Sequence, residues 1–435
     1  MKTNRIVAAI AAAGLVTGLV ACAPTSDSGK TDLLIWDTGL LGKVNDDGTV
    51  PDNSFLDAAA KQYMEENPDI NIEIVQQGGD ITTNQAQFEA ASIAGNGPDI
   101  RVQYAGGPTL SFADYFLDLS DTFDQAIFDD MSGWNTVRAD YASDGELLAM
   151  PYGAGTYFTV FVNKALVEDA GMDPAEVPAS WEDLMDLGQE YKDKTGGPAF
   201  WVANLEGYVG AWVVAALAGG EGGENTFTDM YSGAEPIDGA PMLDAYKAWA
   251  EFGASGLTNP DAGELSNGDA STGFLNGQAP YYIVGMWEDA NLNENFGDGV
   301  SSFFIPMLDG AKYPSVAAGG PSNALSITNY SKHQDEAKDF LRFLAQPEIQ
   351  DMYVEMTQIE ASNSLSADPS VIQNPLLQAQ AAELTTIETK VYPFDNVMPQ
   401  AVIDLFYRLN ASTFLGTTTP EDAAAQLQAA FDSAQ

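Results

Sequence analysis

The fold is decided by the stretch SFLDAAAKQYMEENPDINIEIV (residues 54–75), which has the pattern of a helix followed by that of a strand. Ser54 and Asp57 have the spacing of a capping box, which starts a helix. Apolar residues then recur at helical spacing, at Leu56, Ala59, Ala60, Tyr63 and Met64. The dipeptide Asn67-Pro68 ends the helix. Isoleucines alternate after it as in a half-buried strand, at Ile70, Ile72 and Ile74.

Strand and helix patterns alternate on both sides of this stretch. Residues 33–36 (LLIW) form a short apolar run, typical of a strand covered on both faces. Residues 82–94 predict a second helix, ended by Gly95, and residues 99–104 predict a third strand. Neighbouring parallel strands need a crossover helix between them, so this β-α-β-α-β order predicts a parallel, doubly wound sheet.

The same patterns return in the rest of the chain. Strands are predicted at residues 158–162, 281–286 and 301–305, and helices are predicted to begin at Ser180, to span residues 242–250 and 337–344, and to begin at Thr419. Two α/β lobes are the simplest architecture that covers so many elements. Periodicity alone does not assign each segment to a lobe. The predicted fold class is therefore α/β, with two doubly wound lobes.

The composition excludes several classes of protein. The chain has 435 residues, with 63 Asp and Glu against 17 Lys and Arg, and its formal net charge is −46. A chain this negative repels phosphate backbones, so we predict no nucleic-acid partner. One Cys and one His exclude a disulfide framework, a cysteine-cluster metal site and a two-histidine metal site. We predict no bound metal and no cofactor. Because 45% of the residues are apolar, we expect a folded chain rather than a disordered acidic tail.

The N-terminus has the pattern of a targeting segment. Lys2 and Arg5 precede an uncharged apolar run over residues 6–20, which is long enough for a signal peptide and short for a membrane-spanning helix. The run ends in LVAC (residues 19–22), which resembles the lipobox of bacterial lipoproteins. We therefore predict a signal peptide at residues 1–21 and, at residues 22–31, an acylated Cys22 followed by a flexible tether. An ordinary secretory signal with an incidental Cys is the alternative.

Tryptophans mark candidate ligand contacts. Four of them fall at strand ends or in loop-like segments, next to Asp, Asn or Glu: Trp36, Trp201, Trp212 and Trp287. An aromatic ring packs on the C–H face of a sugar while polar neighbours bind its hydroxyl groups. The same chemistry and position select Tyr104, Asn204 and Glu206. The alternative for each tryptophan is core packing, which we predict for Trp181 and Trp249.

The residues that catalysis usually needs are mostly missing. The chain has no cysteine after residue 22 and no G-x-S-x-G motif, and His333 has the position of a solvated residue in the first turn of a helix. The glycine pairs have neither dinucleotide-binding nor P-loop spacing. Neighbouring carboxylates carry no evidence for a glycosidase in so acidic a chain. Where glycine and asparagine meet in AAGGPSN (317–323), backbone groups and Asn323 are placed to approach a ligand.

Several segments, taken together, resemble one protein family. They are similar to the extracellular solute-binding proteins of ABC importers, specifically the carbohydrate-binding family that includes the maltodextrin-binding proteins. The resemblance covers about residues 32–431 and rests on the order and spacing of the segments. The most specific ones are AAAKQYMEENPDINIEIV (58–75), FEAASIAGNGPDI (88–100), DGELLAMPYGAGTYFTVFVNKALVEDAGMDP (144–174), FLNGQAPYYIVGMWE (274–288) and GGPSNALSITNYSKHQDEAKDFLRFLAQPEIQ (319–350).

The resemblance implies the type II fold of periplasmic binding proteins, in which hinge strands join two α/β lobes and the ligand lies in the cleft between them. Lobe 1 is expected at residues 32–152 and 322–361, and lobe 2 at residues 153–321 and 362–435. The chain is expected to cross between the lobes near residues 151–157, 320–326 and 361–364.

The resemblance also implies ligand contacts at the loop after the first strand, at the hinge, after the GMW segment and at the glycine-rich strand end. These candidates are, in chain order, Trp36, Asp37, Tyr157, Trp287, Glu288, Asp289, Gly319 and Gly320. The acidic loop at residues 40–53 departs from the maltodextrin binders in its length, so we transfer no contacts to it.

The expected function is that of a receptor rather than an enzyme. We predict a lipid-anchored monomer on the extracellular face of the cytoplasmic membrane, in contact with the membrane through its lipid only. It would capture an oligosaccharide by hinge closure and pass it to the transmembrane subunits of an ABC permease. A secreted glycoside hydrolase, and the same fold binding a cationic ligand such as a polyamine, are the alternatives.

Overall fold

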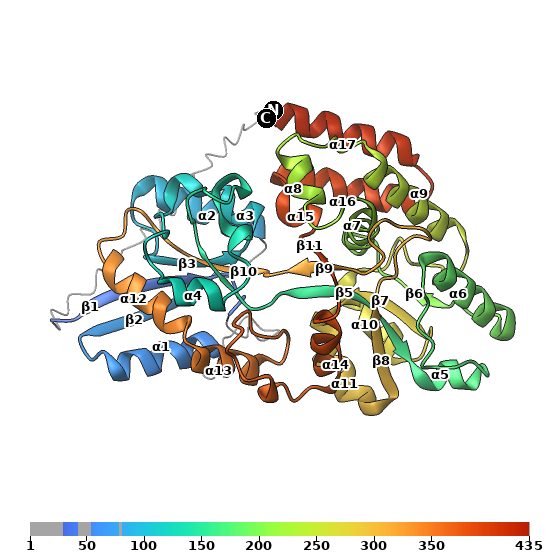
Figure 1. Ribbon diagram of the computed structural model, residues 1–435, viewed down its shortest axis with the longest axis horizontal. Helices are drawn as coiled ribbons and strands as arrows, with labels where there is room; N and C mark the ends of the chain where they lie inside the picture. The colour runs from blue at the N-terminus through green and yellow to red at the C-terminus, as the bar shows by residue number, and fades with distance from the viewer. Residues whose placement is uncertain (1–28, 42–53, 78–80, 435) are drawn as a thin grey trace, which may run out of the picture.

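The computed structural model describes residues 29–41, 54–77 and 81–434. Within them the chain forms two β-sheets surrounded by helices, which lie side by side in Figure 1. The predicted signal peptide, Cys22 and most of the acidic loop at residues 40–53 lie outside the described residues. No helix in the described ranges has the length and apolarity needed to cross a membrane.

The first sheet has the strand order β2-β1-β3-β10-β4. Its strands are β1 (Thr31–Asp37), β2 (Ile70–Gln76), β3 (Ile100–Tyr104), β4 (Met150–Tyr152) and β10 (Asn323–Ile327). β1 runs parallel to β2 and to β3, as predicted from the alternation of strands and helices. β10 runs antiparallel to β3 and β4, which the sequence did not predict. The cause is topological, because β10 enters directly from the second sheet and not from a crossover helix.

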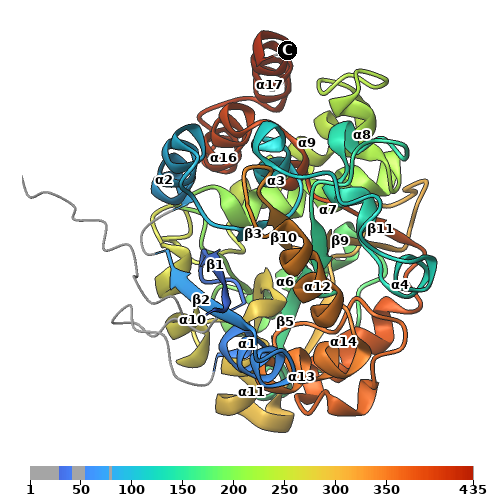
Figure 2. The same cartoon turned by 90° about the vertical axis from the view of Figure 1, so that its left-hand side faces the viewer.

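Helices cover both faces of the first sheet, with α2 and α3 on one side and α1 and α13 on the other (Figures 1 and 2). The helices around this sheet are α1 (Phe55–Glu66), α2 (Ile81–Ala94), α3 (Gly107–Leu110), α4 (Gln125–Asp130), α12 (Gln334–Leu344) and α13 (Pro347–Thr357). α1 begins as predicted, because the Ser54 hydroxyl accepts a hydrogen bond from the amide of Asp57. Pro347 is the first residue of α13, where its missing N–H is harmless.

The second sheet has the order β11-β9-β5-β7-β6, and β8 also pairs with β5. Its strands are β5 (Thr156–Asn163), β6 (Phe200–Trp201), β7 (Tyr281–Gly285), β8 (Val300–Phe304), β9 (Val316–Gly320) and β11 (Thr389–Val391). β5 is its central strand and runs antiparallel to β7, β8 and β9. The second sheet is therefore mixed.

The helices around the second sheet are more numerous. They are α5 (Lys164–Asp169), α6 (Trp181–Thr195), α7 (Tyr208–Gly222), α8 (Thr226–Tyr231), α9 (Ala240–Ala254), α10 (Asn267–Leu275), α11 (Asp289–Phe296), α14 (Pro375–Leu384), α15 (Phe394–Val397), α16 (Gln400–Phe414) and α17 (Pro420–Ala434). α7 is apolar around its whole circumference, which is typical of a fully buried helix. It packs against α9, α16 and β9, so its first turn is held in a fixed position.

The chain passes between the two sheets at three places in the described residues. The first crossing (residues 153–155) joins β4 to β5, and the second (residues 321–322) joins β9 to β10. The third lies between the end of α13 and the start of α14 (residues 358–374). Its residues 363–365 still bond to residues 130–132, and α14 packs on β8. The Ala154 amide donates to the Ala361 carbonyl over 2.8 Å, so the first and third crossings are bonded to each other. We keep the lobe boundaries predicted from the sequence as a working proposal.

Candidate functional site

A cleft of about 630 Å³ lies between the two sheets, within the size range of small-molecule sites. Both lobes line it. The lobe 1 residues are Gly39, Leu40, Tyr104, Ala105, Pro108, Ser322, Asn323, Tyr353, Ile359 and Glu360. The lobe 2 residues are Thr156, Tyr208, Trp212, Asn267, Trp287, Asp395, Asn396, Gln400, Ile403 and Tyr407. A solute in this cleft would touch both halves of the protein.

Lobe 2 contributes an aromatic wall, made of Tyr208, Trp212, Trp287 and Tyr407. The ring of Trp287 stacks on that of Tyr208, with centroids 5.7 Å apart and an interplanar angle of 28°. Trp212 meets Trp287 edge to face at 6.1 Å, and Tyr407 meets Tyr208 in the same way at 6.3 Å. Such offset and edge-on arrangements are the favourable ones for aromatic pairs. The wall is therefore a preformed surface for flat apolar faces of a ligand.

Local sequence explains where these rings stand. Tyr208 is the first residue of α7, and the Asn204 side chain accepts a hydrogen bond from the Gly210 amide in that first turn. Trp287 follows the end of β7, and its ring lies over Gly285. A β-carbon at position 285 would collide with the Trp287 ring, so the glycine permits this placement.

Asp395 holds two members of the wall together. Its Oδ2 accepts hydrogen bonds from Trp212 Nε1 and from the Tyr407 hydroxyl, both at 2.9 Å. Its Oδ1 is buried without a partner among the described residues. Burial raises the pKa of Asp395 to about 6, although both hydrogen bonds lower it. The group is therefore mainly a carboxylate at neutral pH and has one acceptor oxygen to spare.

Glu360 is the second cleft carboxyl group, and lobe 1 supplies it. Its Oε1 accepts hydrogen bonds from the Tyr353 hydroxyl and, over 3.1 Å, from Asn323 Nδ2. Its Oε2 has no hydrogen-bond partner in the part of the chain that the structure describes. Burial raises the pKa of Glu360 to about 7, against the lowering by the Tyr353 hydroxyl and the Gly155 amide.

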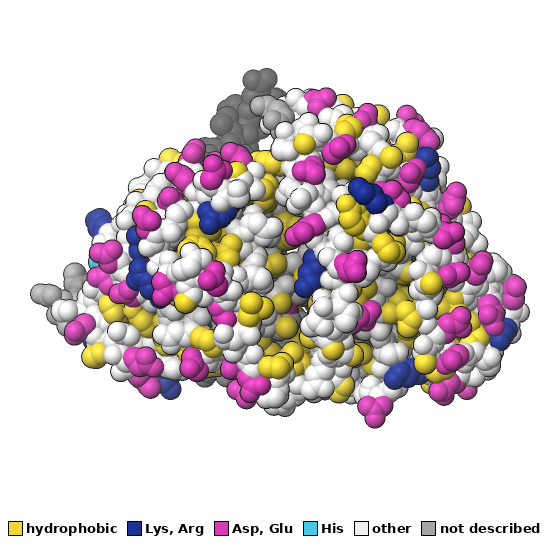
Figure 3. Space-filling view, in the orientation of Figure 1, with side chains coloured by type: hydrophobic (Ala, Val, Ile, Leu, Met, Phe, Trp, Pro, Cys, Tyr) yellow, Lys and Arg dark blue, Asp and Glu magenta, His cyan; other side chains and the backbone are white. Residues whose placement is uncertain are grey.

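The charge of the cleft is negative. Among the described residues that line it, none is Lys, Arg or His. Figure 3 shows Asp and Glu side chains spread over both lobes, with few Lys and Arg between them. The described residues contain no group of three or more His, Cys, Asp and Glu placed to hold a metal ion. An anionic solute would find no opposite charge among the described residues that line this cleft.

Four of the residues selected from the sequence line the cleft together: Tyr104, Trp212, Trp287 and Asn323. Tyr104 ends β3 and is 40% exposed, so its ring stands at the lobe 1 side of the opening. Asn323 begins β10 next to the second crossing. Their contact with a ligand stays a prediction, and we retain them in the proposed contact set.

Two other predicted residues of lobe 1, Trp36 and Asp37, are not among the residues that line the cleft. The Asp37 carboxylate is fully buried and accepts hydrogen bonds from the amides of Gly39 and Leu40, both at 3.0 Å, and from Gln76 Nε2 at 3.1 Å. It fixes the turn after β1 rather than facing the opening. Trp36 packs against a separate small cluster that contains Phe88 and Phe112. We leave Asp37 and Trp36 out of the proposed contact set.

The predicted hinge residues are interior. Tyr157 is 4% exposed and packs edge to face on Phe304, with ring centroids 6.3 Å apart. Gly319 and Gly320 are buried in β9, where they pair with Tyr157 and Thr156 of β5. Of these hinge residues only Thr156 lines the cleft.

The remaining predicted residues of lobe 2 serve local structure. Trp201 is buried and donates from Nε1 to the Ala270 carbonyl at 2.7 Å. Asn204 is fully buried at the start of α7. Glu206 is exposed and accepts from the backbone amide of Asn267, and Glu288 accepts from the side chain of Asn291.

Asp289, the last of the predicted residues, is fully buried and is not among the residues that line the cleft. Its Oδ1 accepts a hydrogen bond from Gln380 Nε2 at 3.0 Å, and its Oδ2 has no partner among the described residues. Burial, and to a lesser degree the neighbouring Glu288, raises the pKa of Asp289 to about 8, although the Gln380 bond lowers it. The group is therefore mainly a neutral acid at pH 7.

Sequence reasoning missed most of the polar cleft residues and part of the aromatic wall. The clearest omissions are Tyr208, Tyr353, Glu360, Asp395 and Tyr407. Tyr208 lies between Glu206 and Trp212, which were both selected, and was open to selection by the same criterion. Glu360 and Asp395 have no such signal, because only the third crossing and the segment after β11 bring them to the cleft.

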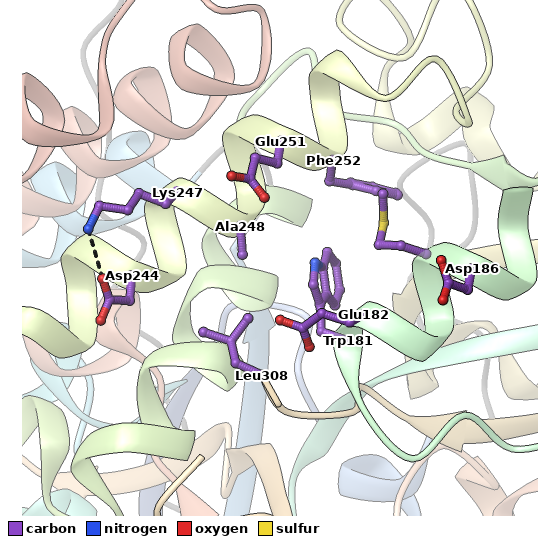
Figure 4. Close-up of a pocket in the computed structure, with 10 residues that line it drawn as sticks. Trp181, Glu182, Asp186, Asp244, Lys247, Ala248, Glu251, Phe252 and Leu308 are labelled. Carbon is purple, nitrogen blue, oxygen red and sulfur yellow. Dashed lines mark hydrogen bonds and ion pairs between the residues drawn. The ribbon is translucent and has the colours of Figure 1, made fainter. Parts of the chain in front are cut away.

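A second hollow, of about 410 Å³, lies on lobe 2 between α6 and α9 (Figure 4). Trp181 forms its centre, and Glu182, Asp186 and Glu251 surround it. The single ion pair there, Lys247 with Asp244 at 2.9 Å, joins side chains that are nearly half exposed. Exposed ion pairs contribute about 0 to 1 kcal/mol, so this pair does little to fix the side chains around the hollow, whereas buried hydrogen bonds fix those of the cleft.

The fold and the cleft are those of the class of two-lobed binding proteins. The chain belongs to the family of bacterial extracellular solute-binding proteins, whose model matches residues 58–381. It is therefore a binding protein and not an enzyme, as the sequence predicted.

Individual relatives agree with this assignment. The sn-glycerol-3-phosphate-binding periplasmic protein UgpB of Escherichia coli K12 is 26% identical over 315 residues, which are 67% of each chain. A chitin oligosaccharide binding protein shares the fold at a TM-score of 0.76 and 20% identity, over 93% of this chain and 99% of the other. A protein described for xylan utilisation by Caldanaerobius polysaccharolyticus does so at 0.74 and 21%, over 92% and 99%.

Proposed function

We propose that this protein is the lipid-anchored receptor of an ABC importer, and that it binds a neutral oligosaccharide in the cleft and delivers it to the membrane permease. The observation that carries the ligand class is the composition of the cleft. Stacked aromatic rings form one wall, and amide and carboxyl oxygens stand beside and opposite them. This combination suits a ring with apolar faces and a hydroxyl-bearing rim.

Charge separates this proposal from a phosphorylated solute. The name of UgpB states sn-glycerol-3-phosphate as its ligand, and a phosphate group calls for cationic or backbone donors. The described cleft residues include Asp395 and Glu360 but no Lys or Arg. Each unpartnered carboxylate oxygen would repel a phosphate and accept a hydrogen bond from a hydroxyl group. We therefore favour a neutral sugar. The names of the structural relatives, which include chitin oligosaccharide and xylan, are consistent with that class.

The test is a titration with matched sugars. The full chain, purified in detergent, is titrated with xylotriose, maltotriose and triacetylchitotriose while tryptophan fluorescence is recorded, since Trp212 and Trp287 line the cleft. Saturable binding of at least one sugar, with no response to glycerol 3-phosphate, is the expected result. Silence towards α- and β-linked oligosaccharides from disaccharides to pentasaccharides would refute the ligand class.

A cationic ligand is the second candidate, and the two cleft carboxyl groups are the observation that favours it. Salt distinguishes the two classes, because attraction between charges weakens with ionic strength whereas stacking of a neutral sugar does not. Spermidine is the probe for this class. Binding of spermidine that is lost between low and high salt, together with no binding of sugars, would select it.

The membrane anchor is a separate part of the proposal and rests on the sequence around Cys22, which lies outside the described residues. Acyl chains on this residue would hold the chain on the extracellular face of the cytoplasmic membrane, next to the permease. Cys22→Ser is expected to release the protein from the membrane fraction into the medium without changing sugar affinity. Retention of the variant in the membrane would contradict the anchor.

A further inference from the structure

Glu360 occupies an unusual position in the fold, because it lies on the third crossing and contacts both the first crossing and the residue that follows the second. It lies on the third crossing, and its Oε1 accepts a hydrogen bond from Asn323, which directly follows the second crossing. Its carboxylate also lies against Gly153 of the first crossing, where a β-carbon would collide with it. The same side chain lines the ligand cleft. One carboxyl group therefore lies in the cleft wall and contacts the first crossing and the residue that follows the second.

The surroundings of Glu360 leave one oxygen for a ligand. The Tyr353 hydroxyl and Asn323 Nδ2 both bind Oε1, and Oε2 has no hydrogen-bond partner among the described residues. Glu360 is 2% exposed, and an unpartnered acceptor at such a position is unfavourable. The nearest titratable neighbours are tyrosines, Tyr353 of α13 and Tyr157 of β5, which bring no positive charge. The Gly155 amide of the first crossing approaches the same carboxyl group and lowers its pKa, and Oε2 keeps an acceptor site for a donor from the cleft.

We propose that Glu360 is a ligand-binding residue whose Oε2 accepts a hydrogen bond from a hydroxyl group of the bound saccharide, and that it thereby couples occupancy of the cleft to the hinge. The inference rests on the proposed function, since it assumes a ligand with hydroxyl donors. A ligand bond at Oε2 stabilises the carboxylate in the position in which Oε1 holds Asn323. Ligand binding therefore favours one arrangement of the three crossings over others.

The matched variants are Glu360→Gln and Asp395→Asn. Glu360→Gln keeps an amide oxygen for Tyr353 and Asn323 and replaces the second acceptor by a donor. Asp395→Asn makes the same chemical change in lobe 2, at a residue that touches none of the crossings in the described contacts. The sugar is whichever of xylotriose, maltotriose and triacetylchitotriose binds the unmodified full chain most tightly. Tryptophan fluorescence gives the affinity, and hydrogen exchange of peptides covering residues 153–155 and 359–361 gives the state of the hinge.

We expect Glu360→Gln to weaken affinity about ten- to hundredfold, the effect of losing one hydrogen bond to a charged group. At saturating sugar it also loses the slowed exchange that the ligand induces at residues 153–155 and 359–361. Asp395→Asn weakens affinity and keeps that slowed exchange. Thermal melting checks that both variants are folded.

Three results would overturn the inference. If Glu360→Gln binds the sugar as tightly as the unmodified chain, Glu360 does not contact the ligand. If the ligand still slows hydrogen exchange at residues 153–155 and 359–361 in that variant, Glu360 does not couple the cleft to the hinge. Equal loss of hinge protection in Glu360→Gln and Asp395→Asn shows that any cleft carboxyl group has the same effect. If no sugar binds the unmodified chain, the proposed function itself fails. If a sugar binds and Glu360→Gln behaves like the unmodified chain, only the role of Glu360 fails.

Discussion

Replacement of Trp287 is the sharpest test of the aromatic wall. The ring contacts three others, Phe158 at 5.6 Å, Tyr208 at 5.7 Å and Trp212 at 6.1 Å between centroids. Aromatic pairs contribute about 0.5 to 1.5 kcal/mol each, so Trp287→Ala is expected to lower the free energy of unfolding by about 2 to 4 kcal/mol. Stability alone therefore does not report the ligand contact.

The ligand contact is read from affinity. One stacked platform contributes about 1 to 1.5 kcal/mol, and each 1.4 kcal/mol is about a tenfold change in the dissociation constant. We expect Trp287→Ala to weaken sugar binding about tenfold in a calorimetric titration carried out well below its melting temperature. Trp287→Phe is the control, because it keeps a ring that can stack on Tyr208, and it should lose less than about threefold.

The pair of variants separates two explanations. If Trp287→Ala is destabilised as expected but binds sugar as tightly as the unmodified chain, the ring supports lobe 2 and does not contact ligand. If both variants lose the same affinity, the indole N–H or the shape of tryptophan matters more than a flat apolar face, and the stacking argument is wrong.

Three further perturbations have defined outcomes. Burial raises the pKa of Asp289 to about 8, so its ionisation lowers the free energy of unfolding as the pH rises from the ordinary pKa of an aspartate to about 8. Asp289→Asn should therefore melt at the same temperature as the unmodified chain at pH 4 and at a higher temperature at pH 8.5. The hydroxyl groups of a bound sugar donate to the carboxylate forms of Asp395 and Glu360, whose pKa values are about 6 and 7. Sugar affinity measured by fluorescence should therefore fall from pH 8 to pH 5. Asp395→Asn should flatten the lower part of this pH profile. Gly153 and Gly171 both have positive φ, at 78° and 70°, but of the two only Gly153 would bring a β-carbon into contact with another residue, Glu360. In chemical denaturation, Gly171→Ala should lower the free energy of unfolding by about 1 kcal/mol through backbone strain, and Gly153→Ala should lower it clearly more.

The fold was largely predictable because its signals are local. The Ser54 cap, the apolar face of α1 and the alternating isoleucines of β2 each depend on a few neighbouring residues. The direction of β10 was not predictable in that way. It depends on where the chain comes from, and the antiparallel pairing with β3 joins residues more than 200 positions apart.

The cleft was predictable only in part, for the same reason. Trp212 and Trp287 stand out because an aromatic residue beside a polar one at an element end is a local pattern. That pattern equally selected Trp36 and Trp201. The structure packs Trp36 against a small apolar cluster, and the buried indole N–H of Trp201 bonds a backbone carbonyl. A sequence does not distinguish a polar group that completes its own loop from one that faces a cleft, since both follow a strand.

The two lobes contribute unequal parts of the site, and this inequality suggests how closure follows capture. Lobe 2 carries the stacked rings, Trp287 and Tyr208 among them, which need only one face of a sugar. Lobe 1 carries Asn323 and Glu360, whose polar groups need a donor at a particular place. Stacking tolerates an open cleft, whereas a hydrogen bond is lost within about 1 Å of misplacement. A sugar seated on lobe 2 therefore gains the hydrogen bonds of lobe 1 only when lobe 1 approaches, so the closed form is favoured by the difference in contacts and not by the total affinity.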